Sequence, residues 1–164
     1  MHGFLKNSDL FSTIDVPGAT STTLLGINNA GQLVGTFESA MVLHGFLESA
    51  GVFSPIDFPG GNFTTPLAIN DAGQIVGGFV DASGRHGFLD SSGIFAAIDV
   101  PGATSTTAHG INDAGQIVGT FEDATGSHGF LATPVVAISE PESLLLVAVG
   151  LAGIAVWAPV LAKT

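Results

Sequence analysis

The sequence predicts an all-β protein made of tandem, four-stranded 42-residue repeats, followed by an apolar C-terminal helix. The first observation is a tetrad, His-Gly-Phe-Leu, that recurs every 42 residues, at His2, His44, His86 and His128. The second is composition, because 23 Gly and 12 Phe residues favour turns and half-buried pleated surfaces. The third is an uncharged stretch near the C-terminus. Self-similarity at a fixed period is typical of stacked or radially arranged repeats.

Other positions obey the same period. An Ile-Asp-Val/Phe-Pro-Gly motif begins at Ile14, Ile56 and Ile98, and most Phe residues fall into three columns. The columns are Phe4, Phe46, Phe88 and Phe130; Phe11, Phe53 and Phe95; and Phe37, Phe79 and Phe121. One large apolar group at one place in each unit is what a shared core requires, so we expect these columns to be core.

Each unit divides into four short strands. In the unit 62–103 we expect strands at about 65–70, 74–80, 86–89 and 94–100. Asn70 opens a tight turn between the first two, and Gly73 suits the left-handed position of a three-residue hairpin. Asn112 and Gly115 repeat that turn. Proline has no N–H to donate to a ladder, so Pro101 ends the last strand.

The units run from 20 to 61 and from 62 to 103, while 104–131 supplies three strands of another and 1–18 supplies two. The sets of strands at the two ends are complementary, so the ends could close a ring between chains. Four strands in about 40 residues favour propeller-like blades in an incomplete ring. A β-trefoil, which also uses three repeats of about this length, remains the alternative.

Composition excludes several classes of protein. Three basic residues stand against 14 acidic ones, a net charge of −11, so the basic patch that nucleic-acid binding needs is missing. Without cysteine there is no disulfide framework, thiolate metal site or cysteine nucleophile. A chain of 164 residues has room for one domain and a tail.

The tetrad, together with Ile-Asp-Val-Pro-Gly-Ala and Gly-Ile-Asn-Asp-Ala-Gly-Gln-Ile-Val-Gly, resembles the HAF repeat family of probable extracellular bacterial repeats. The resemblance covers about 1–131, although the tetrad reads His-Gly-Phe where the family name records His-Ala-Phe. It implies a secreted or surface protein, usually with more repeats, and no established catalytic activity.

The composition changes after the repeat domain, which we place at 1–135. A linker at 136–143 carries Ser139, Glu140 and Pro141, and 144–162 is free of charged side chains. As a helix that segment would span about 28 Å, close to the hydrocarbon thickness of a bilayer. We therefore expect a membrane-spanning helix.

The tail resembles the PEP-CTERM sorting signal of Gram-negative bacteria that make exopolysaccharide. The resemblance implies processing by an exosortase and placement in the cell envelope or outside the cell. Ser139 replaces the first Pro of the motif, and Lys163 is all that remains of the usual basic cluster. A plain C-terminal anchor and a degenerate remnant are the alternatives. Because 1–6 shows no signal peptide, we expect upstream repeats and a signal to have been lost.

Recurring polar residues have a structural and a functional interpretation. The tetrad histidines could meet near an axis and bind metal, but we expect each to begin a strand and hydrogen-bond the neighbouring unit. Recurring aspartates such as Asp57 and Asp71 offer one carboxylate per loop, which leaves room for only weak Ca²⁺ binding, so turn-stabilising bonds are favoured. No other cofactor is expected. We take His44, His86, His128, Phe46, Phe88, Phe130, Asn70, Gly73, Asn112 and Gly115 as structural signature residues.

The leading hypothesis is therefore a non-catalytic surface or matrix repeat protein. A propeller-type glycan- or ligand-binding module is the alternative, although Trp157 in the tail is the only Trp or Tyr available for stacking on sugars. A secreted hydrolase is less favoured, because a Ser-His-Asp set has no Gly-x-Ser-x-Gly elbow to accompany it. Besides the exosortase and the membrane, exopolysaccharide and further copies of the chain are the partners that this setting suggests.

Overall fold

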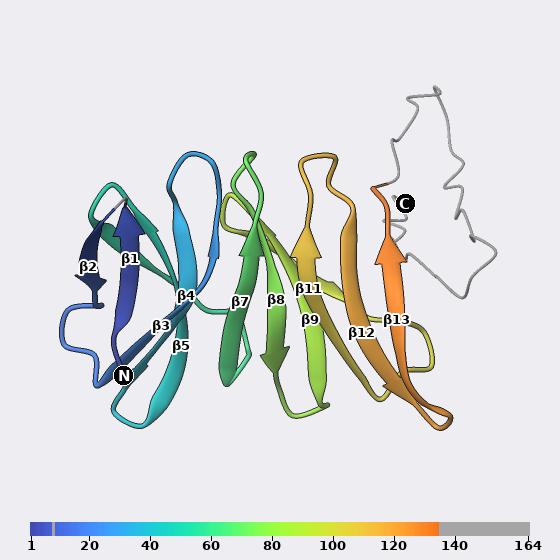
Figure 1. Ribbon diagram of the computed structural model, residues 1–164. Helices are drawn as coiled ribbons and strands as arrows, with labels where there is room; N and C mark the ends of the chain where they lie inside the picture. The colour runs from blue at the N-terminus through green and yellow to red at the C-terminus, as the bar shows by residue number, and fades with distance from the viewer. Residues whose placement is uncertain (8, 135–164) are drawn as a thin grey trace, which may run out of the picture.

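The computed structural model describes residues 1–7 and 9–134, and these residues form strands and turns with no helix (Figure 1). The predicted all-β class is confirmed. The described part also contains no helix long and apolar enough to cross a membrane. The predicted helix at 144–162 and the motif Ser139-Glu140-Pro141 lie outside the described residues.

The first strands form a pair and then a four-stranded antiparallel sheet. The pair is β1 (Gly3–Asn7) with β2 (Leu10–Ile14). The sheet has the order β3-β4-β5-β6, and we call it the first meander. Its strands are β3 (Ser21–Ile27), β4 (Leu33–Ser39), β5 (Val42–Ser49) and β6 (Val52–Ile56).

The next strands repeat this connectivity. Consecutive strands pair antiparallel in the second meander, β7 to β10, and in the third, β11 to β13, and one parallel bridge between Ser105 and Arg85 links the two. The strands are β7 (Phe63–Ile69), β8 (Gln74–Val80), β9 (Arg85–Ser91), β10 (Ile94–Ile98), β11 (Ser105–Ile111), β12 (Ile117–Asp123) and β13 (Gly126–Ala132).

The pairing register advances by the sequence period. Gly35 faces Phe46, Gly77 faces Phe88 and Gly119 faces Phe130 across the second and third strands of the three meanders. The predicted strand 74–80 coincides with β8, and the other three expected strands lie within two residues of β7, β9 and β10 at each end.

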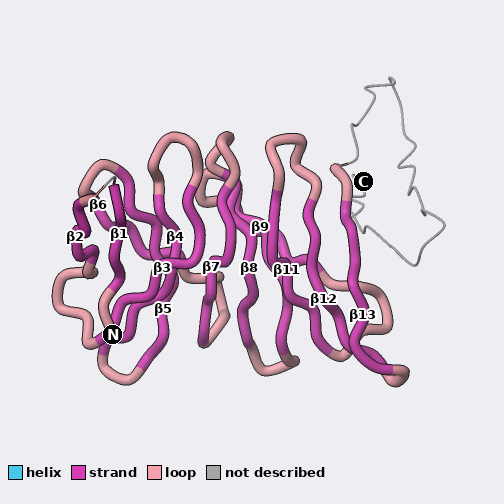
Figure 2. The backbone as a smooth tube through the Cα atoms, viewed as in Figure 1, coloured by secondary structure: helices cyan, strands magenta, loops and turns pink. Residues whose placement is uncertain are grey.

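The tight turns have the predicted conformation. Gly31, Gly73 and Gly115 have φ values of +78°, +76° and +75°, the left-handed region in which glycine is favoured. Each turn joins the first and second strands of a meander, and Figure 2 shows these loops along the upper edge of the molecule. The meanders follow one another in a row, so the turns form a line.

The core lies where one meander packs on the next. Phe46 and Phe88 are 1% and 0% exposed. The first strand of each following meander crosses the preceding sheet closely: a Cβ built on Gly45 would lie 2.7 Å from the ring of Pro66. The carbonyl oxygen of Ile56 in β6 is closer still to that Cβ, so Gly45 is required both by the fourth strand of its own meander and by the first strand of the next.

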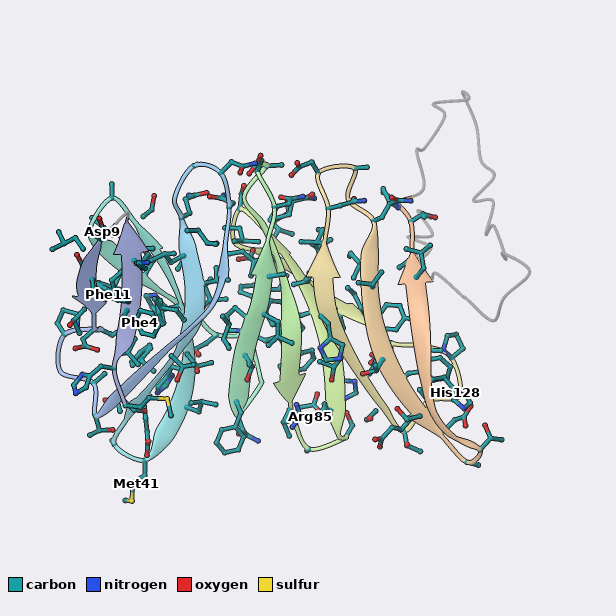
Figure 3. All side chains as sticks on the ribbon, viewed as in Figure 1. Phe4, Asp9, Phe11, Met41, Arg85 and His128 are labelled. Atoms are coloured by element: carbon teal, nitrogen blue, oxygen red, sulfur yellow. The ribbon has the colours of Figure 1, made fainter. Side chains whose placement is uncertain are left out.

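The prediction that all Phe columns are core is wrong at the N-terminal end. Phe4 and Phe11 are 66% and 63% exposed, and their rings pack against each other with centroids 5.9 Å apart. Figure 3 labels both residues at the N-terminal end of the molecule. Both lie on the β1–β2 pair at the end of the row, where β3 packs from one side only. Periodicity marks equivalent positions but does not tell which of them have a neighbour on both sides.

Candidate functional site

A line of hydrogen-bonded turn residues connects the meanders, and we call it the asparagine ladder (Asn28, Asn70 and Asn112). The Nδ2 of Asn28 donates to the carbonyl oxygen of Asn70 at 3.1 Å, and the Nδ2 of Asn70 donates to that of Asn112 at 3.0 Å. Within its own turn, Asn70 Oδ1 accepts the backbone N–H of Gln74 at 2.9 Å. One side chain thus closes a turn and joins it to the next meander.

A second row of contacts runs beside the ladder. Asn29 donates from its backbone N–H and its Nδ2 to the carboxylate of Asp71, at 2.8 and 2.6 Å. The backbone N–H of Asp71 donates in turn to Asp113 Oδ1 at 2.9 Å. The hydrogen bonds from Asn29 lower the pKa of Asp71 below its usual value.

These carboxylates therefore act as acceptors for the preceding turn. The sequence pattern explains these aspartates by bonds that stabilise their own turns. Such bonds alone do not account for the recurrence of Asp71 and Asp113, because each carboxylate accepts from the preceding turn. Among residues 1–7 and 9–134, no three His, Asp or Glu side chains gather closely enough to hold a metal ion.

The tetrad histidines have a different partner from the expected one. His44 Nδ1 lies 3.2 Å from Asp57 Oδ2, and His86 Nδ1 lies 2.8 Å from Asp99 Oδ1. Each pair joins the third strand of a meander to the exit of the fourth, so the contact stays within one meander. The expectation that these rings bond the neighbouring unit is wrong, because the fourth strand returns beside the third and brings the Asp back to the ring.

The ring of each described tetrad histidine in the three meanders also packs on a phenylalanine of the adjacent second strand. The ring centroids are 5.2 Å apart for Phe37 and His44, and 5.1 Å apart for Phe79 and His86. Phe121 and His128 repeat the contact at 5.2 Å. The third phenylalanine column therefore supports the histidines.

His86 has a second set of partners, which together resemble a catalytic triad. Its Nε2 lies 2.9 Å from Ser83 Oγ, while its Nδ1 faces Asp99. Asp81 Oδ1 lies 3.2 Å from the same Nε2. The spacing of Ser, His and Asp is that of a nucleophile, a base and an orienting carboxylate.

The direction of the protons argues against nucleophilic activation. Ser83 Oγ donates to Asp81 Oδ1 at 2.6 Å, so its only proton points away from the histidine. Burial opposes the charged form of His86, but hydrogen bonding and charge from Asp99 and Asp81 outweigh it and raise the pKa of His86 above its usual value. His86 Nε2 is also shared between Ser83 Oγ and Asp81 Oδ1, so it is not directed at the serine hydroxyl alone.

The third meander repeats this arrangement with threonine. Thr125 Oγ1 donates to Asp123 Oδ1 at 2.6 Å and lies 2.9 Å from His128 Nε2. Hydrogen bonds from Thr125 lower the pKa of Asp123, as those from Ser83 lower the pKa of Asp81. Recurrence in two meanders indicates a loop-closing network.

A shallow depression opens beside His86 between the second and third meanders. Its volume is about 270 Å³. It is lined by Ser83, Arg85, His86, Asp99, Ala103, Thr104, Ser105 and Thr106. Arg85 stands where the other meanders have Leu43 and Ser127, so the lining departs from the repeat. Hydroxyl groups, one guanidinium and one carboxylate can together hydrogen-bond a polar ligand.

Sequence reasoning missed a column of buried threonines. Thr22, Thr64 and Thr106 are at most 2% exposed, and each Oγ1 accepts a backbone N–H from the chain segment just before it. For Thr64 the donor is Phe58 N, at 2.9 Å. Their spacing of 42 residues was the available signal.

Comparison with known proteins adds no family assignment. No protein-family model matches the chain, and no curated protein is significantly similar to it.

Proposed function

We propose that the chain is a non-catalytic repeat protein of the bacterial cell surface or extracellular matrix. The observation that carries the proposal is the asparagine ladder. Its side chains recur at the repeat period and bond one meander to the next. A catalytic site would instead bring unlike, non-repeated groups together with a free base.

The meanders are propeller-like blades of a tandem HAF-type repeat in this proposal. Support comes from the equivalent registers and from the packing of each first strand across the preceding sheet. The proposal also treats the segment 136–162 as a PEP-CTERM-like sorting tail, supported by Ser139-Glu140-Pro141 before a charge-free stretch. The tail would place the protein in the envelope through an exosortase.

The proposed sorting function of the tail can be tested in a Gram-negative host that has an exosortase. The full chain, fused to a heterologous secretion signal, is compared with a variant carrying Ser139→Ala, Glu140→Ala and Pro141→Ala. We expect the parent to become accessible to external protease and the variant to be retained in the inner membrane. Pro134→Ala, just before the linker, is the control and should be displayed like the parent. Equal display of the triple variant would overturn the sorting assignment.

The absence of catalysis has its own test. A fluorophosphonate probe labels serine nucleophiles that are activated by a neighbouring base. We expect no labelling of the parent chain between pH 6 and 9, because Ser83 donates its proton to Asp81. Labelling that disappears in Ser83→Ala would favour the hydrolase instead.

A ligand-binding module is the second candidate, favoured by the depression at Arg85. Asp99 accepts and Arg85 donates across a hydroxyl-rich surface, a donor set that suits the hydroxyl groups of an exopolysaccharide. Glycan-array binding that is lost in Arg85→Ala and retained in Lys6→Ala would establish this candidate. If no glycan binds, the structural role remains the better account.

A further inference from the structure

We propose that the outer face of the third meander binds β3 of a second copy of the chain, by displacing the β1–β2 pair of that copy. The proposal depends on packing within the described residues and is independent of export or sorting. The template is internal: β7 lies against β3, β4 and β5, and β11 lies against β7, β8 and β9. The same kind of interface is therefore formed twice within one chain.

An apolar position is open on the third meander. Val34 and Val76 are 0% exposed beneath the following strand, whereas the equivalent Val118 is 50% exposed. We call the surface that carries Val118 and Gly129 the receiving face. Covering it with another first strand would bury the valine as in the two preceding meanders.

The backbone of the receiving face is open at the same place. A Cβ on Gly45 would touch the Pro66 ring of the next first strand, and one on Gly87 would lie 3.4 Å from the backbone N of Ala108. At Gly129, the equivalent position, the nearest atom among the described residues is the carbonyl oxygen of Gly119, 3.9 Å away. A strand can approach Gly129 as closely as in the internal interfaces.

The ladder provides matching polar groups. Asn112 is exposed, and its Nδ2 donates, within the described part, to Gln116 Oε1 at 2.8 Å. In the preceding meanders the same atom also donates to the next turn. At the other end of the row, the carbonyl of Asn28 and the side chain of Asn29 occupy the acceptor positions that Asn112 and Asp113 fill internally. A second copy would extend the ladder.

We take a second copy of the chain as the occupant because β3 begins with the same sequence as β11. Residues 14–23 and 98–107 are identical, and these segments include the first residues of β3 and β11. The receiving face of the second meander already accepts β11. A strand with the same start therefore fits the equivalent face of the third.

In an isolated copy, β1 covers part of the surface of β3 that would contact the receiving face of another copy. Gly3 of β1 lies against Leu24 of β3, as Gly45 lies against Pro66, so β1 takes the place that β13 of another copy would fill. The β1–β2 pair is a two-stranded sheet whose Phe4, Leu10 and Phe11 are all more than 60% exposed. Two-stranded sheets are marginally stable in water. A three-stranded sheet that covers β3 more fully can displace it.

The test uses the absence of cysteine in the chain. Thr120→Cys and Thr23→Cys are made in separate full-length chains, which are mixed and oxidised. Thr120 is the exposed equivalent of Gly78, and a Cβ on Gly78 would lie 3.4 Å from Cγ2 of Thr107, the equivalent of Thr23. We expect a mixed disulfide at least tenfold more abundant than that of a control mixture of Thr120→Cys with Met41→Cys. Met41 is 90% exposed in the β4–β5 loop, at the lower edge in Figure 3, so it reports random collision.

A second variant keeps the test decisive. Val118→Asp, added to the Thr120→Cys chain, puts a charge at an exposed position of the receiving face. The fold should persist, as judged by circular dichroism, and the mixed disulfide should fall to the control level. Cross-linking no greater than in the control, or undiminished by Val118→Asp, overturns the proposal.

Discussion

Asn70 bonds to both of its equivalents: its Nδ2 donates to the carbonyl of Asn112 at 3.0 Å, and its own carbonyl accepts from Asn28 at 3.1 Å. Asn70 is 4% exposed, so its donating side chain is shielded from water between the meanders. Replacing this buried donor with an acceptor would remove the bond and set two acceptors against each other, which costs more than the bond itself contributes. The ladder is therefore a sensitive point in the packing of the meanders.

Asn70→Asp should destabilise the fold by about 1–3 kcal/mol. The change keeps the Oδ1 that accepts from Gln74 but removes the donor to Asn112 and places a charge beside a carbonyl oxygen. Denaturant unfolding measures the effect. Asn112→Asp is the matched control at an exposed, equivalent position and should cost less than about 1 kcal/mol. Equal losses from the two changes would contradict the ladder.

Thr64→Val tests the buried hydroxyl column. Valine has the shape of threonine but offers no acceptor to the N–H of Phe58, so we expect a loss of about 1–3 kcal/mol despite the added apolar surface. Thr64→Ser keeps the oxygen and removes one methyl, for a loss near 1 kcal/mol. Thermal unfolding of both variants makes the comparison. A valine variant as stable as the parent would show that the hydroxyl is dispensable.

The repeat period predicted much of the fold but only part of each contact. Composition and turn residues were enough for β8 and for the left-handed Gly73, because both depend on local sequence. The partner of His86 was not predictable in the same way. A spacing of 42 residues relates it to the neighbouring unit, whereas the return of the fourth strand places it beside Asp99.

The asparagine ladder illustrates a second limit. Asn28 and Asn70 have a sufficient local explanation as turn residues, and that explanation is correct as far as it goes. Their donation to the next turn depends on how closely the meanders stack, which no single turn encodes. Burial has the same limit, since Phe4 and Phe88 are equivalent in sequence but only Phe88 has neighbours on both sides.

Phe88→Ala and Phe4→Ala make the same change at equivalent positions of the period. Phe88 is fully buried, so its truncation should cost about 3–5 kcal/mol. Phe4 is 66% exposed, and its truncation should cost less than about 1 kcal/mol. Denaturant midpoints of the two variants give the comparison. Similar losses would mean that the N-terminal pair is packed as tightly as the core.

Asp90 gives the fold a distinctive dependence on pH. The residue is 6% exposed, burial raises its pKa above the usual value, and the N–H of Gly93 donates to its Oδ1 at 2.7 Å. The folded chain holds this proton more tightly than the unfolded chain. The associated stability is therefore complete below the unfolded pKa, about 4 for an aspartate, and is lost as pH rises through the folded pKa.

Asp90→Asn should remove that loss, because the amide keeps an oxygen for Gly93 and carries no charge. We expect the variant to be more stable than the parent at pH 7, with the difference disappearing below the unfolded pKa near 4. Unfolding midpoints across this range measure it. Glu48→Gln is the control, because it removes the same charge. Glu48 has the equivalent place in β5 and accepts from the N–H of Gly51, but it is only half-buried. An equal gain in the control would indicate relief of net negative charge rather than burial at Asp90, and a pH-independent gain would show that ionisation of Asp90 is not the cause.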